Sequence, residues 1–225
     1  MEYLVQQAVL DGGVKVVFVH IEGFDNEAEP AEWAAERSRR VAALLSIYEG
    51  LDVKADPLLE GFNNLHDNFG VKRRKNLPAS VNLAKLLVKH GDVPHVNTVV
   101  DLYNIVSLES KLALGAHDLA RIEGNFTLRL TDGTERFVPL GQDEPKPVAA
   151  GEYCYCDDAN EVLCRLEVRQ VNKTAVGPAC TGAAFIVQGN EATSGEYLRE
   201  WAEVLGRDVT RLCGGSYRVV EPAVI

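Results

Sequence analysis

The sequence lacks any apolar run close to the roughly 18 residues that a transmembrane helix requires. Its first residues, MEYLVQQAVLDGG, lack the basic stretch and the small-residue cleavage site of a secretory signal peptide. The 225 residues are 46% hydrophobic and 25% charged, which is ordinary for a globular protein. These features argue against membrane insertion and secretion, so we expect a cytoplasmic protein without a membrane partner.

The chain also lacks the cysteine pattern of a disulfide framework or of a zinc site. It contains five cysteines, and an odd number favours a reducing compartment. Only Cys154, Cys156 and Cys164 lie close together in sequence, and their spacing differs from the paired spacing of zinc ligands. Because a free cysteine behaves as a small apolar residue, we expect burial rather than metal ligation, and we expect no cofactor.

Positive charge is scarce, since 23 Lys and Arg residues face 33 Asp and Glu residues and the net charge is −10. Phosphate neutralisation dominates tight nucleic-acid binding, so a protein that sheathes RNA is excluded. The basic residues are densest in the run Lys72-Arg73-Arg74-Lys75. This run is either a solvated loop or a contact site for an anion, such as a transiently bound RNA.

Apolar periodicity and turn residues divide the chain into an early helical part and a later strand-rich part. Tyr3–Leu10 and Val14–Ile21 flank Asp11-Gly12-Gly13, which predicts an N-terminal β-hairpin. Apolar residues at helical spacing predict helices after Pro30, after Pro57, at 80–90, from about 97, and at 194–205. Strands are expected at 126–130, 136–140, 152–156, 162–168, 183–188 and 217–220, with a turn at 131–134 that joins the first two as a hairpin.

This order of elements predicts an α+β fold, with a strongly curved or barrel-like sheet in the second half. We expect a hairpin and helical region over residues 1–93 and a second region over 94–225, packed together as one domain. No G-x-S-x-G motif occurs, and no Cys–His pair stands at an informative distance, so a catalytic triad is not indicated.

One stretch carries most of the functional information: residues 97–124, NTVVDLYNIVSLESKLALGAHDLARIEG. It joins an apolar helix with Asp101 and Asn104 to a glycine turn with His117 and Asp118. The stretch resembles the core of the B3/4 domain, the tRNA-binding and editing module of the phenylalanyl-tRNA synthetase beta subunit, where the matching segment reads roughly VVDVTNYVxLExGQPxHAFDxxKIxG. Motifs similar to those of freestanding members of that family follow in the same order, namely Phe69-Gly70, the basic run, Pro78-Ala79-Ser80, Val100–Ser107, Leu114–Asp118, Gly151-Glu152 and Arg169–Thr174.

The resemblance implies a protein that binds aminoacyl-tRNA or a related amino-acid-like ligand. In its enzymatic form, such a protein would hydrolyse a mischarged aminoacyl ester in trans, without a metal or a triad. Two alternatives stay open. One is a non-catalytic RNA- or amino-acid-binding module that kept the pocket, and the other is a small-molecule ester or amide hydrolase.

The synthetases recognise the extra hydroxyl of the wrong amino acid with a histidine and a glutamate. The resemblance aligns Gly115 with that histidine and Asn172 most nearly with that glutamate, so both groups are absent here. A retained pocket should therefore be wider near Gly115. Arg169 and Gln170 fall where the synthetases have glycines.

The best catalytic candidates are His117 as a base oriented by Asp118, and Arg169 as a bidentate partner of a phosphate or carboxylate. Structural alternatives are turn hydrogen bonds for the first two, and a surface ion pair with Glu167 or Asp157 for Arg169. The structural alternative for Asn104 is a hydrogen bond between helix and loop, and the structural alternative for Thr174 is the capping of a turn. The substrate-binding candidates are Asn104, Gly115, Gln170, Asn172 and Thr174, and the RNA-binding candidates are Lys72, Arg73, Arg74 and Lys75. We expect one concavity to gather Gly115, His117, Asp118, Arg169, Gln170 and Thr174.

Overall fold

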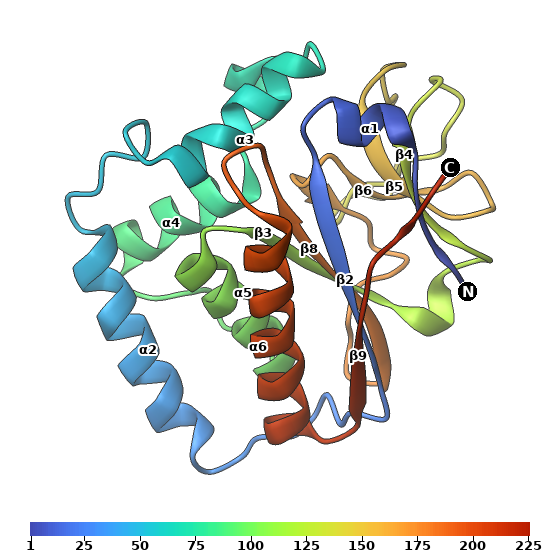
Figure 1. Cartoon of the computed structure of the whole chain (residues 1–225). Coiled ribbons are helices and arrows are strands. Elements are labelled where there is room, and N and C mark those ends of the chain that lie inside the picture. The colour runs from blue at the N-terminus through green and yellow to red at the C-terminus, as the bar shows by residue number, and fades with distance from the viewer.

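The computed structural model describes residues 1–225 as two β-sheets with helices on the outer side of one of them (Figure 1). The first part of the chain forms β1 (Tyr3–Val5), α1 (Gln7–Asp11), β2 (Lys15–Glu22), α2 (Trp33–Tyr48), α3 (Pro57–Asn68), α4 (Ala79–His90) and α5 (Thr98–Ser110). The rest forms β3 (Ala113–Asp118), β4 (Phe126–Leu130), β5 (Tyr153–Cys156), β6 (Val162–Arg165), β7 (Arg169–Gln170), β8 (Gly182–Gly189), α6 (Gly195–Cys213), β9 (Ser216–Val220) and β10 (Ala223–Val224). The predicted α+β class is confirmed, and neither sheet closes into a barrel.

The two sheets and the helices form successive layers. One sheet has the strand order β3-β8-β2-β9 and is antiparallel throughout, whereas the other has the order β10-β1-β4-β5-β6-β7 with β1 parallel to both of its neighbours. Figure 1 shows α5 and α6 against the four-stranded sheet, with α2 and α4 outside them and the six-stranded sheet on the opposite side. No helix combines the length and the apolar character that crossing a membrane would require.

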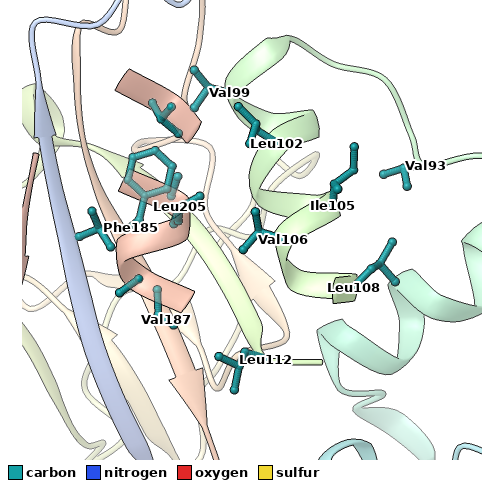
Figure 2. Close-up of a cluster of buried hydrophobic side chains, with 14 of the residues drawn as sticks. Val93, Val99, Leu102, Ile105, Val106, Leu108, Leu112, Phe185, Val187 and Leu205 are labelled. Carbon is teal, nitrogen blue, oxygen red and sulfur yellow. The ribbon is translucent and has the colours of Figure 1, made fainter. Parts of the chain in front are cut away.

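Strand β8 separates two apolar cores because its side chains alternate between its faces. Phe185 and Val187 face the helices, where they join Leu102 and Val106 of α5 and Leu205 of α6 (Figure 2). The intervening Ala184 and Ile186 face the six-stranded sheet and pack with residues such as Phe18, Phe126 and Tyr155. All five cysteines are buried and free, and the burial predicted for Cys154, Cys156 and Cys164 is confirmed.

The helix boundaries follow from local chemistry. Asp56 caps α3 by accepting from the backbone N–H groups of Leu58 and Leu59, and Pro57 occupies the first helical position. Asn97 caps α5 in the same way, through the N–H of Val100. The helices predicted after Pro30 and Pro57, at 80–90 and from about 97 are therefore confirmed, while the helix predicted at 194–205 extends to Cys213.

The predicted N-terminal hairpin is wrong. Residues 7–11 form the short helix α1, and β1 and β2 belong to different sheets. A helix suits this segment because Val9 is its only buried residue, so it does not need the two-residue alternation of a strand. Gly13, at φ 99°, then turns the chain into β2, a conformation open mainly to glycine.

The hairpin predicted through residues 131–134 is also wrong. Strand β4 pairs with β1 and β5, and residues 136–140 make only isolated bridges from Arg136 and Pro139. The side chain of Glu135 holds this segment as a loop, since it accepts from the N–H groups of Asp132 and Gly133 and pairs with Arg129. Proline has no N–H to donate to a strand ladder, which adds to the same effect.

Candidate functional site

A cavity of about 360 Å³ lies where the two sheets and the helices α4 and α5 meet. Its wall includes Gly115 on β3, Asn104 on α5, and Arg169 and Gln170 on β7. Four of the predicted site residues are thus brought together, although more than fifty positions of the sequence separate Gly115 from Arg169. The rest of the wall is formed by Ala79, Asn82, Tyr103, Ala113, Leu114, Leu140, Tyr155, Cys164, Glu167, Val168 and Ile186.

Four polar side chains on this wall are unengaged, whereas Glu167 and Tyr155 are bonded to other residues of the protein. The amides of Asn82, Asn104 and Gln170 and the guanidinium of Arg169 make no side-chain hydrogen bond and no ion pair. The two carboxylates considered as partners of Arg169 bind other groups, because Asp157 pairs with Lys173 and Glu167 with His66. The cavity therefore presents free donors and acceptors above apolar walls, which is the usual composition of a small-molecule site.

His117 is buried outside the cavity wall. It lies on β3 rather than on a turn, and its ring packs edge-on against Phe126 with 5.4 Å between the ring centroids. Its Nδ1 is 2.7 Å from the hydroxyl oxygen of Thr174. Complete burial lowers the pKa of His117 to about 3, so the imidazole is neutral at ordinary pH. This geometry places the imidazole within the packed layer between the sheets, away from the free polar groups.

Asp118 and Thr174 also lie outside the wall and hold the chain locally. The N–H of Asp118 donates to the carbonyl oxygen of Thr174 at 2.9 Å, and the Asp118 carboxylate accepts from the N–H of Ala120 at 3.0 Å. Asn172 organises a neighbouring loop, since its amide donates to the carbonyl of Gln142 and accepts from the N–H of Gly141. That loop supplies Leu140 to the cavity wall.

The basic run is exposed and its members differ in their contacts. Arg73 donates to Asp67 at 2.9 Å and to Glu60 at 2.6 Å, so its charge is neutralised within the protein. Lys72, Arg74 and Lys75 make no ion pair. Of the four residues, only Lys75 lines a groove of about 350 Å³ that adjoins the cavity and shares Asn104 and Arg169 with it.

A buried hydrogen-bond network beneath the cavity was missed by the sequence reasoning. The carboxylate of Glu167 accepts from His66 Nε2 at 2.8 Å and from the hydroxyl of Tyr153. Gln188 links Tyr153 to Tyr155, whose hydroxyl donates to the Gln188 amide oxygen at 2.6 Å. The only signal in the sequence is that Glu167 is a lone carboxylate within the apolar segment predicted as a strand at 162–168.

Comparison with known proteins relates this arrangement to one family and one fold. Residues 68–195, more than half of the chain, match the B3/4 domain. An N-terminal fragment of the phenylalanyl-tRNA synthetase beta subunit from Pyrococcus horikoshii superposes with a TM-score of 0.54 at 14% sequence identity. The match covers 99% of this chain and 52% of that fragment, so the chain spans about half of its length. At this identity the similarity is one of fold, and no curated protein matches the sequence.

Proposed function

The chain belongs to the B3/4 domain family, and from this premise we propose that its cavity binds the amino-acid end of an aminoacyl-tRNA and hydrolyses the aminoacyl ester. The observation that carries the proposal is the set of unengaged side chains, Asn82, Asn104, Gln170 and Arg169, around one cavity. Asn104 and Gln170 are half-buried and Asn82 and Arg169 are exposed, so all four can bind a ligand in the cavity without breaking a hydrogen bond within the protein.

The dimensions of the cavity suit an amino acid. A volume of about 360 Å³ is near the lower end of the range of small-molecule sites, about 300–1,000 Å³. Tyr103, Leu114 and Ile186 provide apolar wall for a side chain. The amide oxygens of Asn104 and Gln170 are acceptors for an α-ammonium group, and their NH₂ groups are donors for an ester carbonyl.

Hydrolysis at this site would depend on positioning and electrostatics. Water adds to the ester carbonyl carbon, and the bond from that carbon to the ribose oxygen breaks. The ribose oxygen takes a proton that the attacking water releases. The NH₂ groups of Asn104 and Gln170 and the guanidinium of Arg169 are donors for the oxyanion that forms in between. His117 and Glu167 are not free bases here, since the first is buried and the second is bonded to His66 and Tyr153.

The test is ester loss from a panel of aminoacyl-tRNAs, both correctly charged and mischarged, measured against the spontaneous rate. We expect accelerated loss for a subset of amino acids. Replacing Asn104 or Arg169 with Ala should slow that loss about tenfold or more, because one oxyanion donor typically contributes about 10²–10³ in rate. Arg39→Ala is the matched control, because Arg39 is exposed on α2, makes no ion pair and lines neither the cavity nor the adjoining groove.

Two other outcomes would change the proposal. Tight binding of aminoacyl-tRNA without ester loss would favour the non-catalytic binding module. Loss of small free esters or amides, with no effect on charged tRNA, would favour the small-molecule hydrolase.

A further inference from the structure

The groove beside the cavity has an unusual charge for this protein. Its eleven lining residues include Lys75 and Arg169 and no carboxylate. The chain as a whole carries ten more negative than positive charges. A groove with two cations and no acid is therefore a local positive site on an acidic molecule, and such a site attracts anions.

Neither cation is neutralised by the protein. Several basic side chains pair with carboxylates, as Arg37 does with Asp101 and Arg165 does with Glu152. Lys75 and Arg169, like the exposed Lys72 and Arg74, make no ion pair or side-chain hydrogen bond. Their charges remain available to a ligand, and an Arg guanidinium in particular matches the geometry of a phosphate.

The N-terminal turn of α4 faces the same groove. Ala79, the first residue of this twelve-residue helix, lines both the groove and the cavity. The residue before it, Pro78, provides no side-chain cap, and the first turn contains no acidic residue. Because Ala79 lines the groove, the positive end of the α4 dipole lies beside the two cations.

The position of Arg169 relates the groove to the cavity. Arg169 and Asn104 line both spaces, whereas Lys75 lines only the groove and Gly115 and Gln170 line only the cavity. A ligand with an amino acid in the cavity would thus place the group attached to its ester next to Arg169, and a more distant anion next to Lys75. Leu77, Leu83 and Leu86 give the groove an apolar side against which a nucleobase can pack.

We propose that this groove is a phosphate subsite, in which Lys75, Arg169 and the first turn of α4 bind the phosphate of the nucleotide that carries the amino acid. The substrate class is then an aminoacyl nucleotide phosphate, the chemical form of an aminoacyl-tRNA end, rather than a free amino-acid ester. This inference rests on the proposed function of the adjoining cavity.

The test uses stable amide analogues. The probes are 3′-aminoacylamino-3′-deoxyadenosine and its 5′-phosphate, each carrying alanine, phenylalanine or tyrosine, with AMP and inorganic phosphate as separate ligands. Calorimetry at low salt should show that the 5′-phosphate increases affinity about tenfold or more, as charge-assisted hydrogen bonds do. Lys75→Gln should abolish most of that gain and leave the affinity for the unphosphorylated analogue unchanged. Arg169→Gln, which alters both spaces, should weaken both analogues.

Lys89→Gln is the matched control, because Lys89 is exposed at the other end of α4 and lines neither space, so it should change neither affinity. Equal affinity of the two analogues, or a phosphate gain that persists in Lys75→Gln, would overturn the subsite and leave the cavity proposal intact. AMP or phosphate binding as tightly as the phosphorylated analogue would also overturn it, in favour of a free-nucleotide site. If no analogue binds, the proposed function and the subsite fail together.

Discussion

The side-chain amide of Gln170 occupies the space that a side chain on Gly115 would need. A methyl carbon on Gly115 would lie 2.5 Å from Nε2 of Gln170, well inside van der Waals contact. The backbone of Gly115 has no positive φ, so the glycine is required by this close approach and not by its conformation. Because β3 and β7 belong to different sheets, the contact joins the two sheets at the cavity wall.

Gly115→Ala should therefore alter the cavity more than the fold. The clashing atom is the far end of a flexible side chain, so the free energy of unfolding should fall by less than about 1 kcal/mol. Displacement of the Gln170 amide should weaken binding of an aminoacyl analogue about tenfold, which corresponds to about 1.4 kcal/mol. Thermal unfolding and calorimetry measure the two effects. In a protein that already carries Gln170→Ala the clash is absent, so adding Gly115→Ala should not weaken binding of the analogue further. A further tenfold loss of affinity in the double variant would contradict this explanation.

Glu167→Ala should destabilise the protein strongly. The substitution leaves the Nε2–H of His66 and the hydroxyl of Tyr153 buried without an acceptor. Burial raises the pKa of Tyr153, so its hydroxyl stays protonated and keeps needing a partner. At about 1–3 kcal/mol for each of the two unsatisfied groups, the free energy of unfolding should fall by about 2–6 kcal/mol. Urea denaturation measures this change. The control is Glu144→Ala, which removes an exposed carboxylate without partners and should change the free energy of unfolding by less than about 0.5 kcal/mol. An equally small effect of Glu167→Ala would contradict the role of the network.

The residues that sequence reasoning located correctly are those governed by local chemistry or by the family resemblance. Proline and glycine signals are local, so α3 and α4 were predicted near their true ends. The approach of Gly115 to Gln170 depends on two separate sheets, and only the resemblance to known proteins related these positions. The surroundings of His117 were not predictable, because Phe126 covers it from the other sheet. The burial of Glu167 likewise depends on His66, a residue 101 positions away.

Replacing Lys72, Arg73, Arg74 and Lys75 together with Ala should weaken tRNA binding and reduce its dependence on salt. Arg73 is already paired with Glu60 and Asp67, so at most three cations are available to phosphates. With a slope of about 0.9 per phosphate contact, the logarithmic salt slope should fall by up to about 2.7. Filter binding over a salt series measures the slope. Arg73→Ala alone serves as the internal control and should leave it unchanged, whereas an unchanged slope in the fourfold variant would exclude these residues from RNA contact.

Because His117 is buried in its neutral form, the free energy of unfolding should decrease as the pH falls below 6.5. Burial lowers its pKa from 6.5 to about 3, so below pH 6.5 the unfolded chain takes up a proton that the folded chain does not. The stability associated with the neutral imidazole is thus complete above pH 6.5 and decreases toward pH 3, by about 1.4 kcal/mol per pH unit. Urea denaturation between pH 7 and pH 4.5 should show a shallower pH dependence for His117→Gln than for the unchanged protein, whatever the stability of the variant at pH 7. His90→Gln, at an exposed position on α4, should leave the slope nearly unaltered. A nuclear magnetic resonance titration that finds the His117 imidazole protonating near pH 6.5 would refute the assignment.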